Sequence, residues 1–111
     1  MDERERKLYA LQAQLCQVLA DPSRLELIHL IGEGERTVGE MIAATGLRQA
    51  NVSQHLSLLR QRGIVATRRE GTTVSYRLAY PEILEACALT RRILLRQLEA
   101  AHELFAPRAE R

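Results

Sequence analysis

Cysteine is scarce in this chain, and long apolar runs are missing. The 111 residues include only two cysteines, Cys16 and Cys87. Two are too few for a disulfide scaffold, and in a reducing compartment both begin as thiols. No long apolar segment follows the charged beginning, MDERERK, so we expect neither a signal peptide nor a membrane span. We therefore expect a cytoplasmic protein.

The motifs of common enzyme classes are also missing. The sequence has no Cys-x-x-Cys pair, no glycine-rich phosphate loop, no nucleophile beside a base and no carboxylates paired for acid and base catalysis. These absences argue against a redox or hydrolytic enzyme. They also give no reason to expect a cofactor.

The composition is that of a folded domain with an uneven charge distribution. Apolar residues make up 46% of the chain and charged residues 27%, which predicts a single domain over residues 1–111. A core this small is marginal alone, so burial against a second copy is expected. Residues 36–77 carry seven basic and two acidic groups, a net charge of +5, whereas residues 1–35 have a net charge of −3. A basic middle third suits binding to a phosphate backbone, although a solvated basic face gives the same imbalance.

The first third predicts two helices. Residues 3–19 place one apolar stripe at helical spacing, made of Leu8, Leu11, Leu15, Val18 and Leu19. Asp21 followed by Pro22 predicts the start of a second helix, because aspartate caps free amides and proline suits the first turn. His29 lies among apolar neighbours in this second helix, and we expect a packed, hydrogen-bonded imidazole there.

Residues 37–63 predict a helix-turn-helix. Thr37 with Glu40 three residues later is a capping box that opens a short helix, and Gly46 supplies a left-handed turn. A second amphipathic helix follows at once and ends at Gly63. Two short helices joined by a tight turn are typical of DNA-binding proteins.

The second helix of this pair separates into two faces. Val52, Leu56 and Leu59 fall in one narrow arc, whereas Gln54, Ser57 and Gln61 point the opposite way. Glutamine and asparagine pair with adenine, arginine with guanine, and serine with bases or phosphates, so this helix suits a major groove. The predicted DNA-binding residues here are Arg48, Gln49, Asn51, Ser53, Gln54, Ser57 and Arg60.

Residues 64–78 predict a β-hairpin. Residues 64–69 and 74–78 are rich in valine, threonine and tyrosine, and Gly71 between them can take a positive φ in a tight turn. A hairpin after a helix-turn-helix is a wing, so we expect a mainly α winged helix-turn-helix fold with a small β-hairpin. The wing residues predicted to reach phosphates or the minor groove are Arg68, Arg69, Thr72 and Thr73, with Arg77 on the return strand.

The last helix is predicted over residues 81–105. Its apolar stripe comprises Ile83, Cys87, Leu94, Leu98 and Phe105. A helix of about 24 residues spans ~36 Å, which is long for so small a domain. We therefore expect a homodimer through the helices at 3–19 and 81–105, with its recognition helices roughly 34 Å apart, one turn of DNA.

Four segments together resemble the ArsR/SmtB family of winged-helix transcriptional repressors. They are VLADPSRLELIHLI, TVGEMIAATGL, ANVSQHLSLLRQRGIV and TRREGTTVSYRL, which cover about residues 18–80. They match the family's A-D-P-x-R segment, V-S-x-H-L recognition helix and R-x-G-x-x-x-x-Y wing. The resemblance implies a homodimer that binds a palindromic DNA operator and leaves it when an effector binds, commonly a metal ion, a metalloid or an oxidised sulfur species.

The metal-binding patterns of that family are missing. Metal-responsive members often carry Cys-x-Cys on the third helix, or Asp-x-His with a His-x-x-His/Glu pair on the last. The corresponding positions here are Val38, Gly39 and Glu40 on the third helix and Ile93 and Arg96 on the last. We therefore expect no metal site, and we interpret the remaining group near the C-terminus, Glu99, His102 and Glu103, as a solvated face.

Cys16 and Cys87 are the candidate sensing residues. Both lie on helices assigned to the dimer interface, so an oxidant could join them by a disulfide or polysulfide bridge and repack that interface. Three alternatives stay open: the effector is arsenite, the effector does not involve cysteine, or the repressor is constitutive. In the last two cases the cysteines are small buried hydrophobes.

Overall fold

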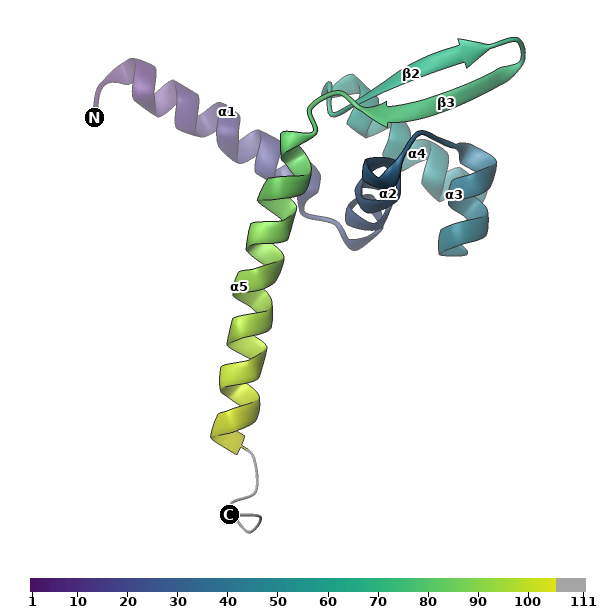
Figure 1. The fold of residues 1–111 in the computed structure, drawn as a ribbon. Coiled ribbons are helices and arrows are strands. Elements are labelled where there is room, and N and C mark those ends of the chain that lie inside the picture. Colours follow the sequence, from purple (N-terminus) through teal and green to yellow (C-terminus); the bar gives the residue numbers. More distant parts are fainter. Residues whose placement is uncertain (106–111) are drawn as a thin grey trace. The chain divides into compact units, whose positions relative to one another are not determined.

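The computed structural model describes residues 1–105, and within them it forms five α-helices and three β-strands (Figure 1). In chain order these are α1 (Glu3–Leu19), α2 (Pro22–Glu33), β1 (Arg36–Thr37), α3 (Val38–Thr45), α4 (Gln49–Gln61), β2 (Val65–Glu70), β3 (Thr73–Leu78) and α5 (Glu82–Phe105). The chain divides into two compact units, Met1–Pro81 and a second that begins at Glu82 and contains α5. The mainly helical fold with a small antiparallel sheet confirms the predicted fold class. No helix of the described residues is long and apolar enough to cross a membrane.

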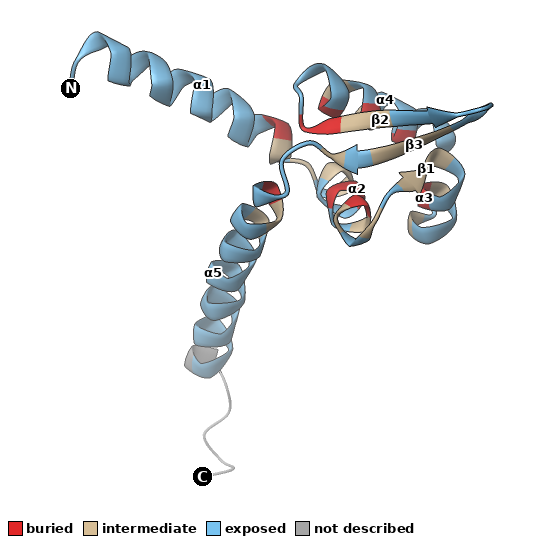
Figure 2. Cartoon of the chain, turned by 45° about the horizontal axis from the view of Figure 1, so that its top comes forward, coloured by how far each residue is buried: buried red, intermediate tan, exposed pale blue. Residues whose placement is uncertain are grey.

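The core of the first unit lies among α2, α3, α4 and the start of β2. Its buried apolar side chains are Val18, Leu27, Ile28, Ile31, Met41, Val52, Leu56, Leu59, Ile64 and Val65. The three α4 residues in this set are at most 1% exposed, which confirms the packing arc predicted for that helix. In Figure 2 the buried positions lie on the sides of α2, α3 and α4 that face one another.

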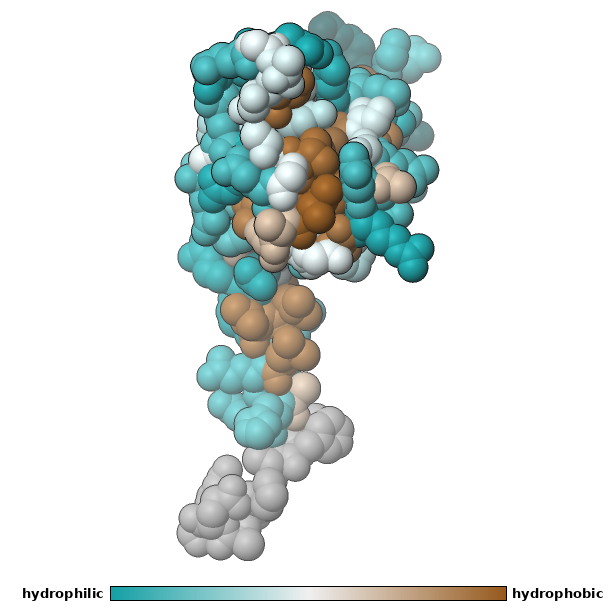
Figure 3. Space-filling model, turned by 90° about the vertical axis from the view of Figure 1, so that its right-hand side faces the viewer, coloured by the Kyte–Doolittle hydropathy of each residue, from teal (hydrophilic) through white to brown (hydrophobic). Residues whose placement is uncertain are grey.

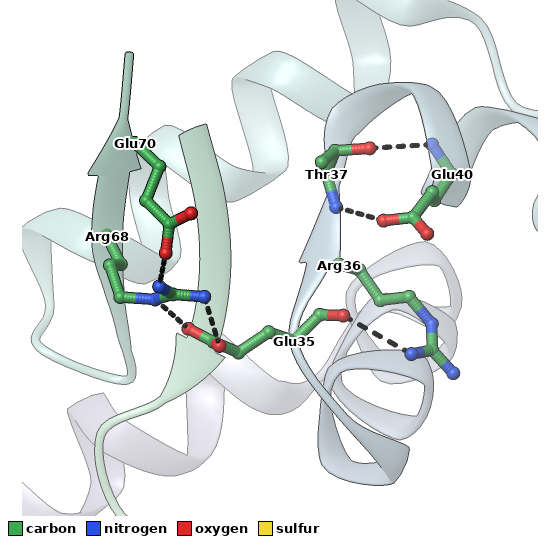
Figure 4. Close-up of polar contacts among 6 residues, drawn as sticks. All are labelled: Glu35, Arg36, Thr37, Glu40, Arg68 and Glu70. Atoms are coloured by element: carbon green, nitrogen blue, oxygen red, sulfur yellow. Dashed lines mark hydrogen bonds and ion pairs between the residues drawn. The ribbon is translucent and has the colours of Figure 1, made fainter. Parts of the chain in front are cut away.

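Side-chain caps fix where α2 and α3 begin. Asp21 Oδ2 accepts a hydrogen bond from the amide of Arg24 at 3.0 Å. Thr37 Oγ1 accepts from the amide of Glu40 at 3.2 Å, and Glu40 Oε1 accepts from the amide of Thr37 at 2.9 Å (Figure 4). The bond from the Thr37 amide is the largest cause that lowers the pKa of the Glu40 carboxyl. Gly46 ends α3 with a φ of 71°, so the predicted capping box and left-handed turn are confirmed.

The end of α4 leads directly into the wing. Gly63 takes a φ of 75°, and the amide of Ile64 donates to the carbonyl of Leu59 at 2.9 Å. This is the long backbone bond of a Schellman motif, which satisfies a carbonyl that the helix end leaves free. Because Ile64 is also buried, the hairpin starts at a fixed place beside α4.

The three strands form an antiparallel sheet in the order β1-β3-β2. The hairpin turn between β2 and β3 consists of two residues. Gly71, the first of them, takes a φ of 61°, as a type II′ turn requires. β1 was not predicted from the sequence. It is only two residues long, and it pairs Arg36 with Tyr76 and Thr37 with Ser75. No periodicity can appear in so short a segment, and Thr37 already carried the signal of a helix cap.

His29 is exposed, so the prediction of a packed imidazole was wrong. Its Nε2 lies 3.5 Å from Glu33 Oε2, one helical turn further along α2. The residues of α2 that are buried are Leu27, Ile28 and Ile31. At 100° per residue His29 points away from that arc, because neighbours in sequence are not neighbours on a helix face.

The predicted stripe on α1 is exposed in the single chain. Leu8, Leu11 and Leu15 are 66%, 54% and 40% exposed, and among the residues of α1 only Val18 is buried. In Figure 2 the exposed colour covers α1 except near its C-terminal end. An apolar stripe exposed on an amphipathic helix is typical of a helix that packs against another surface.

The predicted stripe on α5 is also partly exposed. Leu94 and Leu98 are more than half exposed, and apolar side chains lie at the surface of this helix in Figure 3. The side chain of Phe105, the last member of the predicted stripe, lies outside the described part of the structure. The use of α1 and α5 in dimerisation stays a prediction.

Candidate nucleic-acid interface

α4 presents an exposed polar face. All seven side chains assigned to DNA on this helix and its N-cap are exposed: Arg48, Gln49, Asn51, Ser53, Gln54, Ser57 and Arg60. Gln54 and Ser57 lie opposite the buried arc, at the centre of the face. Asn51 lies on one flank, whereas Ser53 and Arg60 lie on the other. The face is therefore wide enough to offer donors and acceptors to several base pairs.

The N-terminus of α4 has no side-chain cap. Arg48 occupies the N-cap position in an extended conformation, with φ −68° and ψ 145°, and makes no capping hydrogen bond. The first amides of a helix point outward and carry its partial positive charge. Together with the positive charge of Arg48 at the N-cap, they suit an anion such as a backbone phosphate.

The tip of the wing carries the second set of predicted contacts. Arg69, Thr72 and Thr73 are all exposed there. Arg68 and Arg69 are adjacent on β2 and therefore point to opposite faces of the hairpin. The two arginines consequently have different neighbours, although the sequence assigns both to DNA.

Arg68 is held by two carboxylates (Figure 4). Its Nε donates to Glu35 Oε1 at 3.1 Å and its NH2 group to Glu35 Oε2 at 2.9 Å, a two-pronged pair. Its NH1 group also bonds Glu70. The bond from Arg68 lowers the pKa of the Glu35 carboxyl, and the same bond raises the pKa of the guanidinium. A phosphate that contacts Arg68 has to compete with both carboxylates.

Sequence reasoning missed this arrangement around Arg68. Glu70 lies two residues further on β2, and such residues share one face of a strand, so this partner had a signal. Glu35 lies 33 residues earlier in the chain, and no pattern connects it to β2.

Gln61 was also left out of the predicted set of DNA-binding residues, although it is exposed and its position on the helical wheel is beside Gln54 and Ser57.

Comparison with known proteins identifies the family. A family of bacterial regulatory proteins, the arsR family, matches residues 21–67, from the start of α2 into β2. An uncharacterized HTH-type transcriptional regulator of Mycobacterium tuberculosis, Rv0081, is 41% identical over 92 residues, which cover 82% of this chain and 81% of that protein. The chain belongs to the arsR family. Because the members of this family are regulatory proteins, the prediction that the chain is not an enzyme is confirmed.

Three further comparisons show proteins and solved structures to which this arsR-family chain is similar. A biofilm growth-associated repressor of Agrobacterium fabrum is 48% identical over 67 residues, which cover 60% of this chain and 57% of the repressor. The homodimeric winged helix-turn-helix DNA-binding domain of a Mycobacterium bovis protein is 32% identical, covers 90% of this chain and 93% of its own, and superposes with a TM-score of 0.77. The crystal structure of Rv0081 superposes with a TM-score of 0.76 at 40% identity, over 85% of this chain and 95% of its own.

The positions that carry metal ligands in some arsR-family members have other roles here. Val38 begins α3, and Glu40 caps it. Glu99, His102 and Glu103 are exposed on α5. Within residues 1–105, no group of three or more histidine, cysteine, aspartate or glutamate side chains is placed to hold a metal ion.

The two cysteines differ in their surroundings. Cys16 is exposed on α1, whereas Cys87 is half-buried on α5. Burial raises the pKa of the Cys87 thiol, because removal from water disfavours the thiolate. A raised pKa makes Cys87 a weaker nucleophile near neutral pH. Any reaction with an oxidant in solution is therefore expected to begin at Cys16.

The pair between Glu35 and Arg68 leads to a prediction about titration. Arg68→Ala removes the guanidinium, so the pKa of Glu35 should rise toward its ordinary value of 4.5. In the wild type the folded pKa of Glu35 lies below the unfolded pKa. The pair therefore stabilises the fold above the unfolded pKa and loses this contribution as the pH falls through the folded value.

An NMR titration of the Glu35 carboxyl carbon in both proteins measures the shift. The matched control is Arg69→Ala, which removes a neighbouring charge on the other face of the hairpin and should leave the Glu35 titration nearly unchanged. Identical titrations in Arg68→Ala and the wild type would contradict the pair.

Proposed function

We propose that this arsR-family chain is a homodimeric transcriptional repressor that recognises a DNA operator through α4 and the wing, in the cytoplasm. The observation that carries the proposal is the division of α4 into a buried face and an exposed polar face. Burial of Val52, Leu56 and Leu59 leaves Gln54 and Ser57 pointing outward. The Agrobacterium repressor, 48% identical over its matched part, supports repression as the outcome of binding.

The charge distribution supports a docking mode in which α4 contacts the bases and the basic residues around α4 contact the DNA backbone. Residues 36–77, which include α3, α4 and the wing, have a net charge of +5. Backbone contacts supply most of the affinity of such proteins and orient the reading helix, whereas contacts to base edges supply specificity. We assign backbone contacts to Arg48 at the start of α4 and to Arg69 on the wing, both of which are exposed.

Exposed apolar faces support a homodimer. α1 exposes Leu8, Leu11 and Leu15, and α5 exposes Leu89, Ile93, Leu94, Leu95 and Leu98. So many large apolar side chains along two helices mark surfaces that bury against another chain. A symmetric pairing covers the same faces on both copies and presents two recognition helices to a palindromic site. The similar Mycobacterium bovis domain is described as homodimeric.

We predict different effects for two substitutions in the DNA-binding surface. Gln54→Ala should reduce the preference for the best operator over altered sequences by about 5- to 150-fold, because it removes one side chain that reads bases. Arg69→Ala should weaken binding to all duplexes alike and reduce the slope of log affinity against log salt by about 1. Fluorescence anisotropy with a duplex selected from a random library, measured at several salt concentrations, gives both quantities.

The control is Gln12→Ala, which removes the same side-chain type from an exposed position on α1. It should leave sequence preference unchanged. If Gln54→Ala and Arg69→Ala cause equal, sequence-independent losses, α4 does not read bases. If the wild type binds no duplex at low salt, the proposed function is wrong.

We also propose a thiol-reactive effector that acts through Cys16 and Cys87. Cys16 is exposed, and both cysteines lie on the helices assigned to the dimer interface. With peroxide as the oxidant, the two thiols lose two electrons and two protons as the disulfide forms, and the peroxide is reduced to water. A bond between α1 and α5 changes the packing of the interface and therefore the placement of the recognition helices.

The prediction is that Cys16→Ser and Cys87→Ser bind the operator like the wild type but are not released from it by peroxide or an organic polysulfide. Anisotropy measures release, and intact-protein mass spectrometry measures the adduct. Release of both variants at wild-type oxidant concentrations would contradict thiol sensing. Release by arsenite alone points to a metalloid effector, and no response to any reagent points to a constitutive repressor or a different effector.

A further inference from the structure

A half-buried polar cluster connects α1, α2 and α4 within the first unit. Its members are Asp21 and Arg24 at the start of α2 and His55 on α4. The side chains of Asp21 and His55 are only 31% and 21% exposed. His55 lies at the edge of the buried arc of α4, so this cluster faces the protein, away from the exposed polar face. Nothing in the proposed DNA contacts uses these three residues.

Arg24 caps the C-terminus of α1 from a neighbouring helix. Its Nε donates to the carbonyl of Val18 at 2.5 Å, and its NH2 group to the carbonyl of Gln17 at 3.5 Å. The last carbonyls of a helix carry partial negative charge and lack helical partners. The last turn of α1 has no basic residue of its own. Arg24 therefore supplies the charge that this helix end lacks.

The same guanidinium reaches the recognition helix. The NH1 group of Arg24 lies 3.4 Å from His55 Nδ1, and His55 Nε2 lies 3.7 Å from Asp21 Oδ2. The carboxylate favours a proton on Nε2, which leaves Nδ1 as the acceptor for Arg24. Asp21 is itself fixed as the cap of α2, and its bond from the Arg24 amide is the largest cause that lowers the pKa of its carboxyl. One arginine thus bonds the end of α1 and the side of α4 at once.

Little else holds α1 in this unit. Among the seventeen residues of α1, all of them described, Val18 alone is buried. With one buried side chain, apolar packing by itself orients this helix weakly. Arg24 adds two hydrogen bonds at the same end of the helix, to the carbonyls of Val18 and Gln17, and these fix the direction in which α1 leaves the core.

We propose that Arg24 is a positioning residue that fixes α1 against α4 and so sets the distance between the two recognition helices of the dimer. The inference rests on the proposed function, because it takes α1 as part of the dimer interface. Each α4 is then tied through His55 and Arg24 to the helix that pairs with the other copy. The consequence is that loss of this connection broadens the operator spacing that the dimer accepts, with each half-site still recognised.

The test measures operator spacing with four variants of the full chain. Duplexes carry the two selected half-sites at the native separation or separated by two additional base pairs, and a further duplex carries one half-site. We expect the preference of the wild type for the native separation to fall about tenfold in Arg24→Met and in His55→Leu, the scale of one hydrogen bond to a charged group. Affinity for the single half-site should stay within about twofold.

Two variants serve as controls. His55→Asn keeps an acceptor at the position of Nδ1 and should retain the spacing preference. His29→Leu removes from α2 an exposed imidazole that pairs with Glu33, and it should also retain the spacing preference. Circular dichroism and sedimentation check that each variant is folded and dimeric.

Each outcome decides a different point. A wild-type spacing preference in both Arg24→Met and His55→Leu overturns the positioning role. An equal loss on the half-site and on the paired sites also overturns it, because Arg24 then only supports the fold. A wild type that is monomeric, or that has no preferred spacing, instead overturns the proposed dimeric repressor itself.

Discussion

Burial of Val52, Leu56 and Leu59 against α2, α3 and the start of β2 fixes how α4 is rotated about its own axis. A helix has two faces, so the same packing decides which side chains meet solvent. The loss of one of these side chains leaves a cavity and typically costs about 2–5 kcal/mol, a large part of the stability of a small domain. The capping box of α3, the left-handed Gly46 and the Schellman motif at Gly63 then place the turn before α4 and the wing after it. The exposed polar face that we propose for DNA binding is therefore a result of core packing.

The arginines fall into two groups. Some are bonded to other groups of the protein, and others are exposed. Arg68 lies between Glu35 and Glu70, and Arg24 lies between helix-end carbonyls and His55. An exposed pair such as that of Arg68 adds little to stability, so its effect is to fix the wing and to balance charge. Arg48, Arg60 and Arg69 lie exposed, and we propose that they contact phosphates or bases. Counting basic residues in the middle of the chain does not separate these groups, but their geometry does.

The fold class, the helix caps and the two faces of α4 could be predicted from the sequence, because each follows from residues close together in the chain. Thr37 and Glu40 are three residues apart, and the buried residues of α4 follow a helical period. Contacts between distant segments could not be predicted. The pairing of β1 with β3, the bond of Glu35 to Arg68 and the bridge from Arg24 to His55 each depend on how the elements pack. The wrong prediction for His29 has a different and local cause, because its apolar neighbours in sequence lie on a different face of α2.

The apolar faces of α1 and α5 are the surfaces through which we propose that the protein dimerises. We propose that the exposed leucines on both helices pack against a second copy and that the two-fold dimer places two α4 helices about one turn of DNA apart. Hydroxyl-radical footprinting of the full chain on its selected operator tests this claim most directly. We expect two protected patches, related by two-fold symmetry and centred about 10 base pairs apart. A single unsymmetrical patch, or no protection at saturating protein, would contradict it.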